Sequence, residues 1–177
     1  MKLIIDTREQ NLLTFTRFES ERGTLQSGDY SIKGLEHRFT IERKSIADLV
    51  GSLTTGRDRF ERELHRLRGF DFARLLIVGT EADIVNHRYR SKASPKAILH
   101  SLYAFEARYG IPAAWGGSEE RSAALVERWA FWYAREASRA AEAVSVNQMP
   151  LSQQSKPEGA AEDRPQGLKT SMQKTTA

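Results

Sequence analysis

The sequence of 177 residues predicts an α/β domain in which a central mixed β-sheet is flanked by α-helices. Two observations carry this prediction. Strand-like runs, two of them joined as a hairpin, come first in the chain, and segments with helical spacing then alternate with strand-like ones. The sequence contains no internal repeat, so a repeat architecture is not indicated.

Three runs near the N-terminus have the composition of β-strands. Residues 2–6, KLIID, form a short apolar run that ends on a carboxylate. Polar and apolar residues alternate in 29–33, DYSIK, and strand-forming residues mark 36–44, EHRFTIERK. Gly34 lies between the last two runs, so we expect them to pair as a hairpin. Residues 7–18 predict a connector or a short helix.

Four helices and two further strands are expected after the hairpin. Ser45 fits an N-cap, because Asp48 follows three residues later in the first turn. Phe60, Leu64 and Leu67 recur at helical spacing. The expected helices cover residues 46–53, 57–70, 94–110 and 118–144, and the expected strands cover 72–79 and 111–117.

Capping residues and one apolar run support the later elements. Residues 72–79, FARLLIVG, form an apolar run bounded by Gly79, which is typical of a buried strand. Ser94 fits an N-cap, Pro95 the first helical position, and Gly110 the residue just past the helix end. These signals fix the limits of the helix that lies between them.

The periodicity ends at about Ser145. Residues 145–177 are rich in Gln, Ser, Pro, Gly and Lys and show neither helical nor strand spacing. Such a composition predicts a disordered polar tail. The sequence therefore predicts one domain over residues 1–144, followed by this tail.

Composition excludes several classes of protein. With no cysteine, the chain has no disulfide, no thiolate zinc site and no Cys nucleophile. No apolar run is long enough to span a bilayer, and the N-terminus lacks the apolar stretch of a signal peptide. We therefore expect a cytoplasmic protein without a membrane partner. The net charge of +4 is compatible with nucleic-acid binding but also with many other enzymes.

Four acidic positions are candidates for a site, Asp6, Glu9, Asp29 and Glu42, and three of them lie at or beside the ends of predicted strands. Asp29 begins one hairpin strand and Glu42 lies near the end of its partner, so antiparallel pairing brings the two together. Two close carboxylates repel unless a cation lies between them, and Mg²⁺ prefers oxygen ligands. Lys44 lies on the same strand face as Glu42 and can stabilise charge on a phosphate. A metal, a water and a cation suffice for phosphodiester hydrolysis.

A plainer interpretation exists for each of these signals. A single Glu-x-Lys is most often a solvated charge pair, and a single Gly-Asp is most often a turn. Only their joint placement at the two ends of one predicted hairpin favours a reactive site. The basic loop at 86–92, NHRYRSK, contacts phosphates or is simply solvated, and the sequence does not separate these alternatives.

Four segments resemble the XPF family of structure-specific endonucleases. GDY at 28–30 and ERKSIAD at 42–48 match the family signature G-D-x(n)-E-R-K-x(3)-D. IIDTRE at 4–9 resembles the family's opening strand, and GRDRFERELHRL at 56–67 resembles the helix after the signature. The resemblance is in order along roughly residues 1–135. It implies that the domain at 1–144 is a nuclease domain with a restriction-endonuclease-like core of the PD-(D/E)xK superfamily.

The resemblance also implies a site. The residues that it assigns to catalysis are Asp6, Arg8, Glu9, Asp29, Glu42, Arg43, Lys44 and Asp48. Asp6, Asp29 and Glu42 are the implied ligands of Mg²⁺ or Mn²⁺, and the backbone carbonyl of Arg43 is expected to join them. Lys44 is expected to position or activate the attacking water, and the other residues to support the site.

Branched DNA, cut near a junction of duplex and single strand, is the implied substrate. The basic face of the predicted helix is the expected contact with the DNA backbone, through Arg57, Arg59, Arg62 and Arg66. The resemblance further implies a homodimer through the nuclease domain, and the aromatic run WAFWY at 129–133 leaves an apolar helix face available for it. Relatives carry a tandem helix-hairpin-helix domain that this sequence lacks, so we expect weak junction selectivity or a protein partner that supplies it.

Two other functions remain open at this point. The first is a non-catalytic DNA-binding subunit, although such relatives have lost signature carboxylates or the lysine, all of which this sequence keeps. The second is a nuclease that acts on RNA or on plain duplex ends, because chemistry directed at the backbone does not read the sugar.

Overall fold

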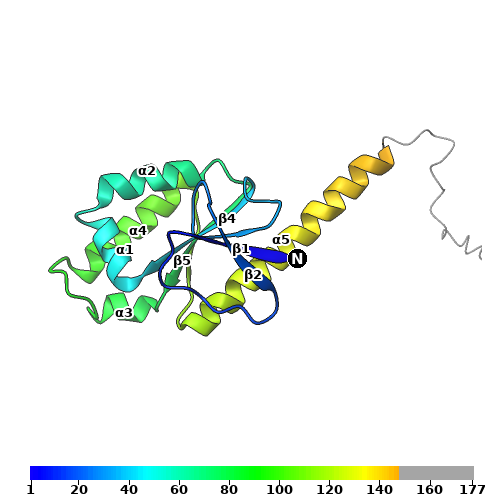
Figure 1. The fold of residues 1–177 in the computed structure, drawn as a ribbon. Coiled ribbons are helices and arrows are strands. Elements are labelled where there is room, and N and C mark those ends of the chain that lie inside the picture. Colours follow the sequence, from blue (N-terminus) through cyan, green and yellow to red (C-terminus); the bar gives the residue numbers. More distant parts are fainter. Residues whose placement is uncertain (148–177) are drawn as a thin grey trace, which may run out of the picture. The chain divides into compact units, whose positions relative to one another are not determined.

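A six-stranded mixed β-sheet forms the centre of the computed structural model, which describes residues 1–147 (Figure 1). The strands lie in the order β2-β1-β3-β4-β5-β6. Their bounds are β1 (Lys2–Asp6), β2 (Glu19–Gly23), β3 (Tyr30–Ile32), β4 (Phe39–Ser45), β5 (Phe72–Val78) and β6 (Ala113–Trp115). β3 is antiparallel to both β1 and β4, and the other neighbours are parallel.

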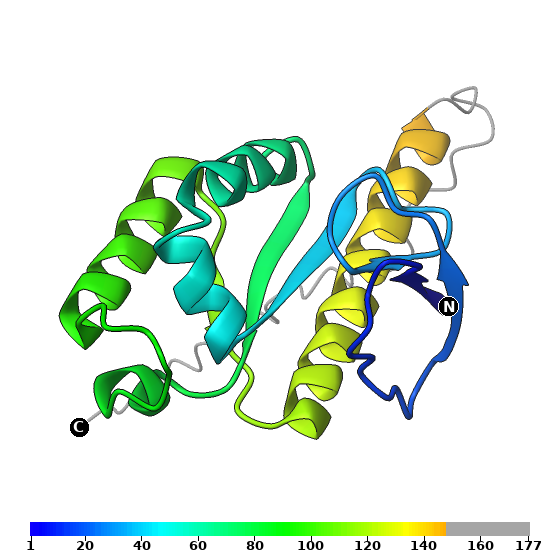
Figure 2. The ribbon, with the colours of Figure 1, turned by 60° about the vertical axis from the view of Figure 1, so that its left-hand side comes forward.

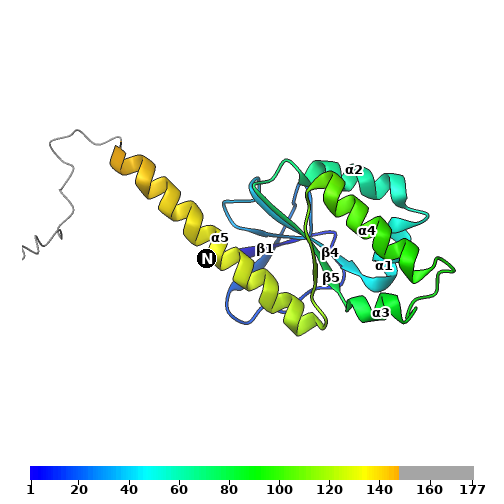
Figure 3. The ribbon, with the colours of Figure 1, turned by 180° about the vertical axis from the view of Figure 1, so that it is seen from behind.

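Helices cover both faces of this sheet (Figure 2). Their bounds are α1 (Ile46–Leu53), α2 (Arg57–Leu67), α3 (Glu81–Val85), α4 (Pro95–Tyr109) and α5 (Glu119–Asn147). Helices α1 to α4 pack on one face in a core that includes Phe60, Ile77 and Phe105. The first part of α5 packs on the other face against Phe39 and Ile41. Figure 3 shows the same two layers from behind.

The sequence predicts most of these elements correctly. The β3–β4 hairpin is present, and Gly34 in its connection has the positive φ of 85° that a glycine adopts readily. Ser45 caps α1 by accepting a hydrogen bond from the amide of Asp48 at 3.1 Å. The predicted α/β fold with a central mixed sheet is confirmed.

Two elements are absent from the prediction. β2 has the polar sequence ESERG and lies at the sheet edge, where a strand needs only backbone pairing with β1 and no apolar face. α3 is a single short turn held by a capping box between Thr80 and Asp83. Residues 7–18, for which a connector or a short helix was expected, form a connector.

The limits of two helices also differ from the prediction. α2 ends at Leu67 rather than at residue 70. α5 continues to Asn147, past the domain boundary expected at residue 144, and residues 148–177 of the predicted tail lie outside the described residues. None of the helices described within residues 1–147 is long and apolar enough to cross a membrane.

One buried carboxylate ties α5 to the connector between β1 and β2. Glu127 is 2% exposed, and its Oε1 accepts hydrogen bonds from the amides of Thr16, Arg17 and Phe18 at 2.9, 2.6 and 3.3 Å. Three successive amides that converge on one oxygen form an anion-binding concavity. The connector is therefore fixed although it has no regular secondary structure.

Candidate active site

A groove of about 590 Å³ opens beside the C-terminal half of β4. Its walls come from the loop after β1, the loop before β3, and helices α1 and α2. Glu9, Asp29 and Glu42 line it together with Lys44, so three of the four predicted acidic positions share one groove with the predicted lysine.

Asp29 is held between β1 and β4 by backbone hydrogen bonds. Its amide donates to the carbonyl of Ile41 at 2.8 Å, and its carbonyl accepts from the amide of Asp6 at 2.8 Å. Its Oδ2 accepts from the amide of Arg43 at 2.7 Å. The carboxylate is thus fixed beside β4 before any ligand binds.

Gly28 allows Asp29 to take this position. Its φ is 80°, and a Cβ there would lie 2.0 Å from Oγ1 of Thr40. That hydroxyl is itself fixed, because it donates to the carbonyl of Ser27 at 2.9 Å. The Gly-Asp pair of the signature therefore has a backbone reason: only glycine fits where the chain turns against β4.

Glu42 and Lys44 point to the same side of β4, as the two-residue period of a strand predicts. The Nζ of Lys44 forms an ion pair with Oε1 of Glu42 and lies 3.3 Å from Oε2 of Glu63. The same Nζ lies 5.4 Å from the ring centre of Phe60. The lysine is therefore enclosed by two carboxylates and an aromatic face.

Burial and mutual repulsion perturb the two central carboxylates. Burial raises the pKa of Asp29 to about 6, and the charges of Glu9 and Glu63 act in the same direction. Burial also raises the pKa of Glu42, and the nearby charge of Asp29 adds to the effect. Burial alone lowers the pKa of the Lys44 ammonium, but the charges of Glu42 and Glu63 outweigh it and raise that pKa. Lys44 is therefore a cation at neutral pH.

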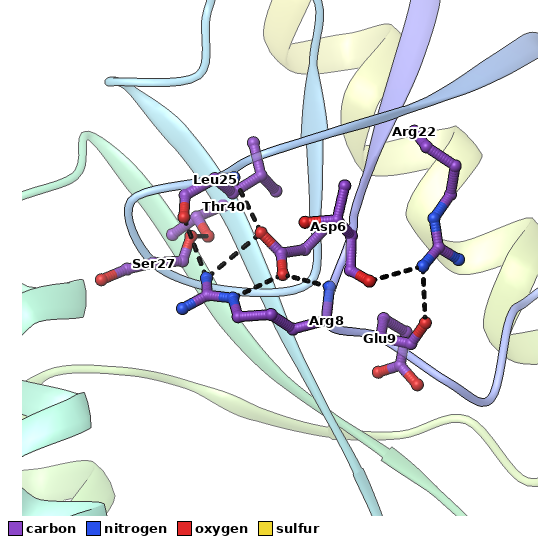
Figure 4. A network of polar contacts seen from close by, with 8 residues as sticks. Asp6, Arg8, Glu9, Arg22, Leu25, Ser27 and Thr40 are labelled. Atoms are coloured by element: carbon purple, nitrogen blue, oxygen red, sulfur yellow. Dashed lines mark hydrogen bonds and ion pairs between the residues drawn. The ribbon is translucent and has the colours of Figure 1, made fainter.

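Asp6 is buried and fully hydrogen-bonded (Figure 4). Its Oδ1 accepts from the amide and the Nε of Arg8 at 2.8 and 2.6 Å, and its Oδ2 accepts from a guanidinium nitrogen of Arg8 at 3.1 Å and from the amide of Leu25 at 2.7 Å. Burial alone raises the pKa of Asp6, but these bonds outweigh it and lower that pKa. All four acceptor positions are taken, so Asp6 has none left for a metal in this arrangement.

Arg8 and Glu9 shape the loop after β1. Arg8 also donates to the carbonyl of Leu25 at 2.9 Å, which links this loop to the one before β3. Glu9 lines the groove, and its Oε1 accepts from the amide of Asn11 at 2.6 Å. Figure 4 shows Arg22 bonded to the backbone of the same loop, including the carbonyl of Glu9 at 3.1 Å.

The side chain of Arg43 leaves β4 on the opposite face from Glu42 and Lys44. It is 8% exposed, its nearest acid is Glu119 at the start of α5, at 3.9 Å, and its Nε has no hydrogen-bond partner among the described residues. Its amide, not its guanidinium, contacts the site through Asp29. The side chain of Arg43 therefore lies between the sheet and the start of α5.

Asp48 lies at the groove and at the start of α1. Its Oδ2 accepts from the hydroxyl of Ser45 at 2.6 Å, while its amide donates back to that hydroxyl. This reciprocal pair holds the first turn of α1 directly after the strand that carries Glu42 and Lys44. Asp48 therefore fixes the backbone that follows Lys44.

The four arginines expected to contact DNA separate into two sets. Arg59 and Arg66 line the groove. Arg57 turns toward α4, where it lies 4.3 Å from the ring centre of Phe105 and donates to the hydroxyl of Ser101 at 3.3 Å. Neither Arg57 nor Arg62 belongs to the groove lining.

Glu63 is the charged residue of the groove lining that the sequence interpretation missed. It lies on α2, four residues after Arg59 and three before Arg66, so the three share one helix face. The spacing of Glu63 with Arg59 and Arg66 could have identified it from the sequence, because α2 directly follows the strand and the helix that carry the signature. What the sequence lacked was the packing that brings this face over Lys44.

The donor set fits a hard divalent cation. Within residues 1–147 no three or more His, Cys, Asp or Glu side chains converge as a complete metal-binding cluster. Two neighbouring carboxylates, the half-buried Asp29 and the buried Glu42, nevertheless suit Mg²⁺, which binds through one or two carboxylates and keeps several waters. Their raised pKa values also indicate carboxylates that a cation would stabilise.

Comparisons with known proteins agree with this fold. The family model described as "ERCC4 domain" matches residues 5–128. The solved structure "XPF from Aeropyrum pernix" matches with a TM-score of 0.60 and 21% identity, over 80% of this chain and 69% of that chain. A second structure, "XPF from Aeropyrum pernix, complex with DNA", matches with a TM-score of 0.61 and 20% identity, over 76% and 66%. None of the curated proteins matches.

Proposed function

Because the chain belongs to the XPF family of nucleases, with an ERCC4 domain over residues 5–128, we propose that it hydrolyses phosphodiester bonds in branched DNA. The observation that supports this most is the convergence of Asp29, Glu42 and Lys44 in one groove. Two carboxylates and a cation beside a strand end are the residues that metal-assisted phosphodiester hydrolysis requires. The proposed cofactor is Mg²⁺ or Mn²⁺.

Asp29 and Glu42 would hold the metal ion, with the backbone carbonyl of Arg43 as a further oxygen donor. A bound divalent ion supplies a Lewis acid that offsets the negative charge of the phosphate. We assign a different role to Asp6 and Arg8. They hold the loop before β3 in place through Leu25, and this loop leads into Asp29.

Lys44 contributes a charged ammonium rather than a base. In the metal-free groove burial lowers the pKa of Lys44, but the charges of Glu42 and Glu63 outweigh it and raise that pKa, which favours the ammonium as a hydrogen-bond donor. From this position it orients a water or stabilises negative charge that develops on the phosphate. Arg59 and Arg66 at the groove are suited to neighbouring phosphates of the backbone.

The proposed partners follow from the same family. The relative from Aeropyrum pernix is described in complex with DNA, and we extend that partner to this chain. Branched DNA is the substrate class, a second copy of the chain is the proposed oligomeric partner, and a further protein is the proposed source of junction selectivity.

Cleavage of labelled fork and flap DNA with Mg²⁺ or Mn²⁺ tests the proposal. We expect Lys44→Ala and Asp29→Asn to abolish cleavage while DNA binding, measured by fluorescence anisotropy, stays within about threefold, because neither change removes a phosphate-binding arginine. Glu61→Gln, outside the groove on the same helix as Arg59, is the matched control.

Two outcomes would contradict the proposal. If both site variants cut as fast as the wild type, the assignment of the site is wrong. If the wild type binds forks but cuts none of a panel of flap, fork, Holliday, single-stranded and RNA substrates with either metal, the alternative of a non-catalytic DNA-binding subunit is favoured.

A further inference from the structure

Glu63 lines the groove, and the proposed function gives it no role. Phe60, Leu64 and Leu67 are buried and fix α2 on the core. The side chain of Glu63 is 22% exposed, and its Oε2 lies 3.3 Å from Nζ of Lys44. Its carboxylate lies over the C-terminal half of β4, at the level of Lys44.

Lys44 has two acceptors within reach. Its ammonium contacts Glu42 on its own strand and Glu63 on α2, the latter at 3.3 Å. An ammonium has three donors, so it can bond both carboxylates at once or keep either one alone. The side chain of Lys44 is only 13% exposed, and water does not readily replace a lost carboxylate partner there.

Three carboxyl groups surround one ammonium at this point of the groove. Lys44 lies among Asp29, Glu42 and Glu63, and it contacts the last two directly. A metal ion held by Asp29 and Glu42 would compete with Lys44 for the Glu42 carboxylate. An ammonium left without a carboxylate at this degree of burial is strongly disfavoured.

We propose that Glu63 is a positioning residue that holds Lys44 while Glu42 binds a metal ion. Lys44 then changes from two carboxylate partners to one without leaving the groove, and Glu42 is released for the metal. Glu63 acts through Lys44 and has no contact of its own with the substrate. The inference rests on the proposed function, because it takes Asp29 and Glu42 as the metal ligands.

A double-mutant cycle of Glu63→Gln and Lys44→Ala tests the inference on the whole chain. Calorimetric titration with Mn²⁺ in the absence of DNA measures metal affinity directly. With Lys44 present, Glu63→Gln leaves Glu42 as the only carboxylate partner of the ammonium, so we expect metal affinity to fall about tenfold. In the Lys44→Ala background, Glu63→Gln should lower the affinity for Mn²⁺ by less than about threefold, because only the loss of the Glu63 negative charge then acts on the metal.

Single-turnover cleavage supplies a second readout. We expect Glu63→Gln to lower the rate at saturating metal about tenfold to a hundredfold, while DNA affinity does not fall. Glu61→Gln, two residues earlier on α2 and paired with Tyr109 at 3.0 Å, is the matched control for both readouts and should change neither. Thermal unfolding of each variant confirms that it is folded.

Each result separates the two proposals. An equal loss of Mn²⁺ affinity in both backgrounds overturns the inference, because Glu63 would then act by charge alone and not through Lys44. A wild type that binds Mn²⁺ and shows the expected cycle but cuts no nucleic acid overturns the proposed function and leaves the inference standing. A wild type that binds no Mn²⁺ in the absence of DNA but cuts forks with Mn²⁺ overturns the inference and leaves the proposed function standing.

Discussion

Asp29 and Glu42 are held close together against their own repulsion. Asp29 is half-buried beside β4 and Glu42 is buried on it, and loss of solvent raises the pKa of each. The backbone bonds of Asp29 to its neighbours on β1 and β4 supply the constraint that keeps the carboxylate there. A site that is ready for a cation is therefore less stable without one, which is a common property of functional sites.

Asp29→Asn is expected to stabilise the metal-free protein at pH 7.5 by about 1 to 3 kcal/mol, since a folded-state pKa of about 6 lies above that of the unfolded chain. The amide oxygen still accepts from the Arg43 amide, so that hydrogen bond is retained. Urea unfolding with a chelator present measures the difference.

The same difference should depend on pH. The ionised carboxylate destabilises the fold above a pH of about 6, and protonation removes this effect as the pH falls through that value toward 4. An advantage of the Asn variant that stays constant from pH 8 to pH 4 would contradict the burial of an ionised Asp29.

At the scale of elements, the turn before β3 and the start of α1 determine where the site residues lie. Gly28 turns the chain against Thr40 of β4, and Ser45 with Asp48 starts α1 directly after Lys44. Both devices use short polar or small residues at positions where the backbone needs them. The signature is thus partly a folding signal and not only a set of charged groups.

Gly28→Ala is expected to destabilise the protein by about 3 kcal/mol or more and to abolish cleavage. The new Cβ would lie 2.0 Å from Oγ1 of Thr40, and the positive φ adds strain of its own. Thermal and urea unfolding measure the loss of stability.

Gly34→Ala separates the two contributions. Gly34 has a φ of 85°, but a Cβ added there would meet no atom within 4 Å, so only the backbone strain of about 1 to 2 kcal/mol applies. Equal losses for the two variants would contradict the close approach of Gly28 to β4.

The two helical layers cover different faces of the sheet. Helices α1 to α4 cover the face that carries the groove, and α5 covers the other face (Figure 2). On α5, Phe131 and Trp132 are 37% and 56% exposed, and their rings pack edge to face at 5.4 Å. This exposed aromatic pair is on the helix where the sequence predicts the surface for a second copy.

A homodimer is expected, with a mass in light scattering of twice the 20.0 kDa of one chain. The double variant Phe131→Asp, Trp132→Asp should be monomeric, because buried charges oppose association at an apolar interface. Val85→Asp, an exposed apolar position on α3, is the control. A monomeric wild type, or a dimer unaffected by the double variant, would contradict this surface.

The sequence alone determined the parts that depend on local pattern. The hairpin, the cap at Ser45 and the common face of Glu42 and Lys44 follow from turn chemistry, capping and the two-residue period of a strand. These rules act over a few residues and therefore appear in the letters. The family follows instead from the resemblance of the runs at 28–30 and 42–48 to its signature, and the match of the family model over residues 5–128 confirms it.

Only the tertiary structure decided which side chains meet across elements. It brought Glu63 of α2 to Lys44, turned Arg57 toward α4, and filled every acceptor of Asp6 with donors from two loops. These outcomes depend on how helices pack and on which face each one turns to the sheet, over separations that no local pattern encodes. The sequence predicted the strand that carries Glu42 and Lys44. The packing of the helices determined which residues lie against it.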